Sequence, residues 1–321
     1  MTALPSIALV LLSLWYYYRE NVGDYHVKIG TTKLAESEVI QTMCDHIDYK
    51  TYQPLFFASM PSYQEKKPLA GPVELFFQFT PYASVIQQAA IVPDGCLDII
   101  FSNEKGTPSA RVCGPVLSAR QVVYLPNTTY FGVRFLPGYS ESYLGIPTGE
   151  LINKEIHLSE LLKNRDIVYS VCEEQDFYKK IENFLRFLEH TFSGNTEVPV
   201  LLTYILNRII KSNGTVRIDE LADQAGYTSR YIHKVFVRHA GYSPKFFSRI
   251  IRFQNSLKYL SGSSDRKIVD IAAEAGYYDQ SHFLTDFSKL ATMKPHEILQ
   301  AMVSSEEIEL TNFLYFKSGT I

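Results

Sequence analysis

The spacing of apolar residues changes about halfway along this chain of 321 residues. Between about residues 49 and 162, short apolar runs alternate with turn signals rich in Pro, Gly and Asn. The runs are 73–79, 97–101, 121–125 and 130–135, and the turn signals include 93–95, 114–115, 126–127 and 137–138. Short runs with regular turns are typical of antiparallel sheets. This part predicts a β-rich domain, built as a barrel or a sandwich.

Beyond about residue 158, apolar residues recur at spacings of three and four, which predicts helices. In 176–191 the residues on one such face are Phe177, Ile181, Phe184, Leu185 and Leu188. A second apolar helix is predicted over 200–211. Two interpretations stay open for these helices, which either carry dimer contacts or pack on their own domain.

Two segments further along share one pattern, 221–236 and 272–289. Each reads as a short Ala-rich helix, a Gly turn, and a second helix whose polar side chains lie between apolar ones. The turns are Ala225–Gly226 and Ala275–Gly276, where Ala allows close helix contact and Gly tolerates a positive φ. We therefore expect two helix-turn-helix units, which would read two successive major grooves of DNA.

In the first unit, Thr228 or Ser229 is placed to N-cap the second helix. The side chains expected to point inward are Ile232, Val235 and Phe236. The basic side chains left on the outer face are Arg230, His233, Lys234 and Arg238. Arg and Lys can bond guanine in the major groove, so this face has the chemistry of a DNA reader.

In the second unit Asp279 is the expected N-cap. The predicted inner positions are Ile268, Ile271, Ala272, Phe283 and Phe287, and the predicted outer positions are Gln280, Ser281, His282, Thr285 and Ser288. Residues 244–261 between the units predict one long helix, with Pro244 in its first turn and Gly262 after its end. A rigid spacer suits DNA, whose major groove repeats about every 34 Å along one face.

These segments resemble the AraC/XylS family of bacterial transcription regulators over about 209–299. The residues that carry the resemblance are 218–227, 236 through 241–244, and 271–283. By family position the base readers are Arg230, His233 and Lys234 in the first unit, and Gln280, Ser281, His282 and Thr285 occupy the equivalent surface in the second. The resemblance implies a cytoplasmic regulator bound to double-stranded promoter or operator DNA. It favours an activator, which would also contact RNA polymerase.

The chain departs from the family at Thr285 and Ser288, where a basic residue is common, and at Thr292, where Gly is usual. Phosphate contacts drive salt-dependent affinity, so two missing cations weaken the grip of the second unit. Our hypothesis is that the first unit supplies most of the base specificity and the second mainly positions the protein.

The β-rich part resembles a domain found ahead of such readers, through residues 91–100, 114–115 and 131–138. The resemblance implies that it senses a small effector or mediates dimerisation. Asp94, Cys96 and Asp98 in and after its Pro-Asp-Gly-Cys turn form a candidate ligand-binding cluster. The alternative is structural, because an Asp in such a turn commonly bonds its own backbone.

Charge is unevenly divided along the chain, whose net charge is −3. Residues 207–300 hold 14 Lys or Arg and nine Asp or Glu, a net +5, which leaves −8 for the remainder. This asymmetry fits a basic DNA reader attached to an acidic partner domain. The four cysteines, Cys44, Cys96, Cys113 and Cys172, are scattered and predict reduced thiols.

No zinc spacing, Ser/His/Asp set or phosphate loop stands in the sequence. We accordingly expect no enzyme activity, no metal and no cofactor. An enzymatic β-domain fused to a DNA reader remains the alternative.

The expected division is an extension over 1–45, a β-rich sensor domain over 46–170, a helical linker over 171–206, the DNA-binding domain over 207–300 and a tail over 301–321. Residues 4–18 are almost wholly apolar but shorter than the about 20 residues of a membrane span. We expect a buried segment or an extension from an upstream start codon, with a membrane-anchored sensor as the alternative.

Overall fold

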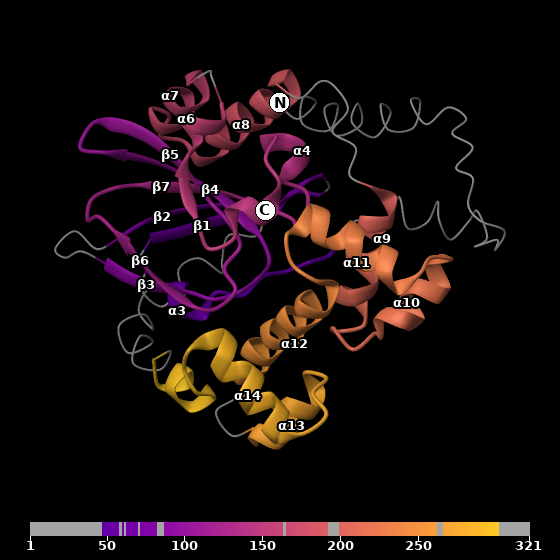
Figure 1. Ribbon diagram of the computed structural model, residues 1–321. Helices are drawn as coiled ribbons and strands as arrows, with labels where there is room; N and C mark the ends of the chain where they lie inside the picture. The colour runs from indigo at the N-terminus through magenta and orange to yellow at the C-terminus, as the bar shows by residue number, and fades with distance from the viewer. Residues whose placement is uncertain are drawn as a thin grey trace, which may run out of the picture.

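The computed structural model describes residues 47–57, 60, 62–69, 71–81, 87–162, 165–191, 199–261 and 266–301. The extension 1–45 and almost all of the tail fall outside these ranges. Within them a sheet-rich N-terminal part precedes an all-helical C-terminal part, which is the α+β organisation that the predicted β-rich domain and the helices after it imply (Figure 1). None of the helices in these ranges has the length and hydropathy to cross a membrane.

Six antiparallel strands form the main sheet, in the order β1-β2-β7-β4-β5-β8. Their bounds are β1 Ser62–Lys66, β2 Val73–Thr80, β4 Leu97–Glu104, β5 Thr107–Cys113, β7 Tyr130–Phe135 and β8 Glu155–His157. Two further strands, β3 (Gln87–Ile91) and β6 (Arg120–Tyr124), pair as a separate small sheet. The four predicted runs are β2, β4, β6 and β7, so the antiparallel β-rich domain is confirmed.

The two faces of the main sheet carry different layers, because side chains alternate along each strand. One face is covered by α7 (Asp166–Cys172) and α8 (Phe177–Thr191), and Phe184 there packs edge-on against Phe76 at 6.2 Å between ring centroids. The other face meets α3 (Pro54–Phe57) and the small sheet, where Phe79 packs against Tyr124 at 4.8 Å. The result is a sandwich with an apolar layer between its two sheets.

One inner position of α8 differs from the predicted face. Leu185 is 37% exposed, whereas Lys180 is 5% exposed. The ammonium group of Lys180 donates to Gln78 Oε1 at 2.7 Å and lies over the ring of Phe131. Apolar periodicity could not anticipate a lysine whose stem is buried and whose head group has a polar partner.

The segment expected as a linker, 171–206, is divided between two cores. Helix α8 packs on the main sheet, and α9 (Val200–Lys211) packs with the first helix-turn-helix unit. Short helices α4 (Glu141–Leu144) and α5 (Thr148–Leu151) lie between β7 and β8 along the chain, and α6 (Leu158–Leu161) follows β8. The sequence pattern gave the helices but not the bodies on which they pack.

The C-terminal part is two helix-turn-helix units on one shared helix, as predicted. The bounds are α10 Ile218–Ala225, α11 Ser229–Ala240, α12 Pro244–Ser261, α13 Ile268–Glu274 and α14 Gln280–Ala291. The first half of α12 contributes Phe247 and Ile250 to the core of the first unit, and the second half contributes Phe253 and Leu257 to that of the second. Helix α12 therefore joins the two units through their cores.

Candidate nucleic-acid interface

Both recognition helices begin at a side chain that caps them. Thr228 Oγ1 accepts from the backbone N–H of Tyr231 at 3.2 Å, and Asp279 Oδ1 accepts from that of His282 at 2.7 Å. The preceding glycines, Gly226 and Gly276, have φ of +70° and +84°, which favours glycine over other residues. The prediction of Thr228 or Ser229 as the first cap resolves to Thr228.

The exposed face of α11 is basic and has no partner in the described part of the chain. Its side chains, Arg230, His233, Lys234 and Arg238, are all exposed, and none forms a hydrogen bond or salt bridge with the described residues. Ile232 and Phe236 are fully buried beneath them, whereas Val235 is half-buried. Long cations with no internal partner remain available to phosphates and base edges.

The exposed face of α14 is nearly neutral. Gln280, Ser281, His282 and Thr285 are exposed as predicted, but Ser288 is half-buried. Beneath them, Asp286 accepts two hydrogen bonds from Arg249 of α12, at 2.9 and 3.1 Å. The Nε2 atom of His282 lies 3.8 Å from Oδ2 of Asp286, one turn further along the same helix.

Counted from the caps, the two helices align position by position. Ile232 and Phe236 correspond to Phe283 and Phe287, and all four are buried. In the same register Lys234 corresponds to Thr285, Arg238 to Lys289, and Val235 to Asp286. The second helix thus has a cation, Lys289, at the position of Arg238 in the first, and this residue is not among those that the family resemblance implies.

Two exposed aromatic features were also missed. Tyr227 and Tyr231 stack at the start of α11, with ring centroids 5.1 Å apart. Tyr278 precedes the cap of α14 and is 93% exposed. Periodicity assigns aromatic residues to the interior, so it had no signal for these rings.

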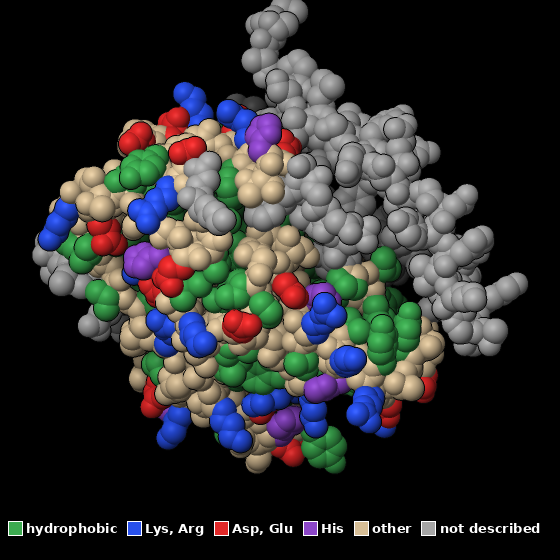
Figure 2. Space-filling model, turned by 45° about the horizontal axis from the view of Figure 1, so that its top comes forward, with side chains coloured by type: hydrophobic (Ala, Val, Ile, Leu, Met, Phe, Trp, Pro, Cys, Tyr) green, Lys and Arg blue, Asp and Glu red, His purple; other side chains and the backbone are tan. Residues whose placement is uncertain are grey.

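Lys, Arg and His side chains gather along the lower part of the face in Figure 2.

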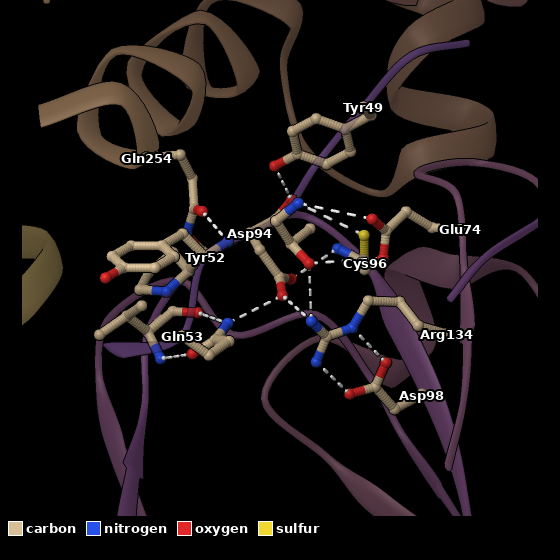
Figure 3. A network of polar contacts seen from close by, with 12 residues as sticks. Tyr49, Tyr52, Gln53, Glu74, Asp94, Cys96, Asp98, Arg134 and Gln254 are labelled. Atoms are coloured by element: carbon tan, nitrogen blue, oxygen red, sulfur yellow. Dashed lines mark hydrogen bonds and ion pairs between the residues drawn. The ribbon is translucent and has the colours of Figure 1, made fainter. Parts of the chain in front are cut away.

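The candidate cluster of the β-rich domain is brought together at the turn after β3 (Figure 3). Asp94 Oδ1 accepts from the backbone N–H of Cys96 at 2.9 Å, as the structural alternative expected. Asp94 Oδ2 accepts from Gln53 Nε2 at 2.8 Å and lies 3.2 Å from Arg134 Nη1. Arg134 also forms a bidentate pair with Asp98, at 2.8 and 2.7 Å. Asp94 and Cys96 are buried, and Asp98 is half-buried.

Burial dominates the electrostatics of this cluster. It raises the pKa of the Cys96 thiol well above its usual value, so that group stays protonated. It raises the pKa of Glu74 to about 7, against the opposing charge of Arg134. Burial also raises the pKa of Asp98, and Arg134 again opposes it. The guanidinium of Arg134 thus pairs with two carboxylates, Asp94 and Asp98, and its charge also acts on a third, Glu74.

A cavity of about 320 Å³ opens between the two sheets beside this cluster. Its walls are largely apolar, with aromatic rings that include Phe56, Phe77 and Tyr124, and its polar lining includes Gln53, Asp98 and Arg134. Such a lining could hold a small organic molecule and orient it by a few polar contacts. Among the described residues, no group of three His, Cys, Asp or Glu side chains is arranged to hold a metal ion.

Comparison with known proteins places two families along the chain. Residues 221–301 match a helix-turn-helix domain family, and residues 62–157 match a domain of unknown function, DUF6597. The HTH-type transcriptional activator RhaS of Pectobacterium atrosepticum is 31% identical over 87 residues, which are 27% of this chain and 31% of RhaS. RhaS of Pectobacterium carotovorum subsp. carotovorum is 28% identical over 110 residues, 34% and 38% of the two chains. The chain thus matches about a third of the length of these relatives.

Parts of solved structures also align with this chain. ToxT from Vibrio cholerae aligns over 75% of this chain and 98% of its own, at 14% identity and a TM-score of 0.39. A probable AraC family transcriptional regulator from Rhodopseudomonas palustris aligns over 32% of this chain and 98% of its own, at 29% identity and a TM-score of 0.29.

Proposed function

This chain carries the double helix-turn-helix domain of the AraC/XylS family, and on this premise we propose that it is a sequence-specific DNA-binding transcriptional regulator. The observation that carries the proposal is the duplication. Two capped helices, α11 and α14, each expose a row of polar side chains, and both units are packed on α12. Such a pair can enter two successive major-groove segments on one side of a duplex.

We assign most of the base reading to α11. Arg230, His233 and Lys234 lie within the first two turns after its cap, the part of a recognition helix that meets base edges. Arg238 lies a turn further on, where a cation suits the phosphate backbone. The absence of partners for these side chains within the described residues leaves their donors for DNA.

We assign a mainly positioning role to α14. No Lys or Arg stands among Gln280, Ser281, His282 and Thr285, so this set makes fewer phosphate contacts than the face of α11. The amide of Gln280 can still bond adenine, and the backbone amides at the start of α14 can approach a phosphate. This unit would fix the register of the protein on its site.

The β-rich domain is the proposed regulatory part. The cavity between its sheets, with apolar walls and a few polar groups, supports a small organic effector. Homodimerisation through this domain is the other role that the family resemblance implies. An activating role, with contact to RNA polymerase, is supported by the RhaS relatives, which are named activators.

The test is selection of binding sites from a random pool of double-stranded DNA by the full chain. We expect enriched sequences with two half-sites whose centres lie about 10 base pairs apart, one turn of the duplex. The double variant Arg230→Ala/Lys234→Ala is the matched control, and it should not enrich the half-site that α11 contacts. Recovery of a single half-site, or of no shared sequence, would contradict the two-reader function.

A further inference from the structure

The Pro-Asp-Gly-Cys turn at 93–96 accepts two hydrogen bonds from the DNA-binding domain through its backbone carbonyl groups. Pro93 O accepts a hydrogen bond from Gln254 Nε2 of α12 at 2.8 Å. Gly95 O accepts one from the hydroxyl of Tyr242 at 2.8 Å. Both donors are buried, so each bond lies in a protected environment where loss of one partner leaves a polar group unsatisfied.

The turn is held in this shape from within the β-rich domain. The carboxylate of Asp94 bridges Cys96 N, Gln53 Nε2 and Arg134 Nη1, and the hydroxyl of Tyr49 donates to Asp94 O at 2.6 Å. Gly95 has φ +78°, and a Cβ there would lie 2.5 Å from the hydroxyl oxygen of Tyr242. The turn therefore has a fixed backbone shape, and the lack of a side chain at Gly95 lets the hydroxyl of Tyr242 come close to it.

The two partners of the turn lie between the recognition helices. Tyr242 follows the end of α11 and packs against Phe236 of that helix, with ring centroids 6.0 Å apart. Gln254 adjoins Phe253, whose ring packs against Phe287 of α14 at 5.2 Å. One turn thus bonds to Tyr242 in the core of the first unit and to Gln254, the neighbour of a core residue of the second.

The β-rich domain also contacts the far end of each recognition helix. At the end of α11, His239 Nδ1 lies 3.1 Å from Glu141 Oε2. At the end of α14, Leu290 O accepts from the backbone N–H of Ala119 at 2.7 Å. Both contacts are opposite the capped ends that would face DNA.

We propose that the turn 93–96 is a positioning element for DNA reading, through which the β-rich domain fixes the separation of α11 and α14. This inference rests on the proposed function. Packing attaches each unit to one half of α12, and the turn bonds to Tyr242 just before that helix and to Gln254 in its second half, so that the β-rich domain is a third body tied to both units. Tyr242 and Gln254 are then positioning residues that set which spacing of half-sites is read.

The same turn connects reading to the cavity. Gln53 lines the cavity and bonds Asp94 Oδ2, Val92 O and Val92 N, at 2.8, 2.9 and 2.9 Å. Arg134 also lines the cavity and holds the Asp94 carboxylate. An occupant that displaces either side chain relaxes the turn. Gln53 is therefore a positioning residue that contacts Asp94 and the chain beside it in the β-rich domain.

The experiment measures spacing selectivity rather than affinity alone. Duplexes carry the two selected half-sites with their centres moved in single base-pair steps across about one turn. The full chain is compared with Tyr242→Phe, Gln254→Ala and Gln53→Ala. Ser256→Ala is the matched control, since this buried serine of α12 bonds Phe253 O within its own helix. A duplex with one half-site reports whether the readers themselves are intact.

We expect the unaltered chain to lose about tenfold in affinity at two base pairs from its best spacing, which corresponds to the cost of about one poor base contact. In the three variants, the loss of affinity at two base pairs from the best spacing should be about threefold or less. Their affinity for the single half-site should stay as in the unaltered chain. Ser256→Ala should keep the original profile.

Unchanged spacing profiles in Tyr242→Phe and Gln254→Ala would overturn the inference. A flat profile for the unaltered chain would also overturn it, although the proposed function would stand. If no paired site is selected at all, the proposed function itself fails. Tyr242→Phe decides the matter if Gln254→Ala does not fold, because it retains the packed ring and removes one hydroxyl.

Discussion

The two helix-turn-helix units have the same pattern of caps and buried residues, but their exposed faces differ in charge. Both begin at a capping side chain and bury two large residues at matching positions, Ile232 and Phe236 in one and Phe283 and Phe287 in the other. The outer face of α11 carries Arg230, Lys234 and Arg238 beside His233, without partners in the described residues. That of α14 carries Lys289 beside His282, and its other selected residues are uncharged.

The two helices also differ at one inner position. Val235 of the first unit is half-buried, and its counterpart in the second is Asp286, which is buried and ion-paired with Arg249 of α12. The second recognition helix is thereby tied to the spacer by charge as well as by packing. A well-packed core fixes where a helix lies, and its outer residues remain available for specificity. Here the first unit places more Lys and Arg side chains on its outer face than the second does.

The largest test of this comparison is alanine substitution on the two faces. Arg230→Ala and Lys234→Ala should each weaken binding to the selected site by at least about tenfold, as a lost base or phosphate contact of 1–3 kcal/mol implies. Gln280→Ala and His282→Ala should cost less. Footprinting titrations at fixed salt give the ranking. If alanine at His282 or Gln280 cost more affinity than alanine at Lys234, the assignment of roles would be wrong.

A charge placed on the second face should make it resemble the first. Thr285→Lys puts a cation at the position that corresponds to Lys234, and it should raise affinity several-fold at low salt. The slope of log affinity against log salt should steepen by about 0.9, the value for one added phosphate contact. Thr285→Gln is the matched control, since it adds length without charge. Equal slopes for the two variants would show that α14 does not approach the backbone.

The caps offer a smaller test, because the first is neutral and the second is an aspartate. Asp279→Asn keeps an acceptor for the His282 N–H and removes a negative charge that would face the duplex. We expect affinity to rise about two- to threefold, and the free energy of unfolding to change by only a few tenths of a kcal/mol. Asp279→Ala, which removes the acceptor, should cost about 1 kcal/mol. Urea unfolding and binding titrations separate the two effects.

The sequence was sufficient for the elements with strong periodicity. Strands β2, β4, β6 and β7 and helices α8 to α14 follow from apolar spacing and turn residues. Strand β1 (SYQEK) is a polar, mostly exposed edge strand, and β8 has three residues, so neither has an apolar pattern to detect. Strand β5 begins Thr-Pro-Ser and was missed for the same reason.

The candidate site was predictable only where it is local. Periodicity correctly left Arg230, His233 and Lys234 outside, because their helix is read from adjacent residues. The pair between Arg249 and Asp286 joins residues on different helices, and the turn 93–96 finds Gln254 and Tyr242 about 150 positions away. Such contacts depend on how the two domains pack, which no local pattern encodes.

The smallest expected effect concerns how the far ends of the two recognition helices are held. The end of α14 is held by a backbone hydrogen bond, which does not titrate, and that of α11 by His239 beside Glu141. Burial lowers the pKa of His239 below its usual value, against the opposing effect of Glu141. The folded chain therefore resists protonation of this histidine, while the unfolded chain takes up the proton as the pH falls through about 6.5.

This contribution to stability is present above the unfolded pKa and is lost as the pH falls through it. His239→Gln should remove that part of the loss between pH 7.5 and 5.5, as measured by the free energy of unfolding in urea. His233→Gln, which removes an exposed histidine from the same helix, is the matched control. If both variants followed the unaltered chain, the first helix would be held as independently of pH as the second, and this distinction between the units would be lost.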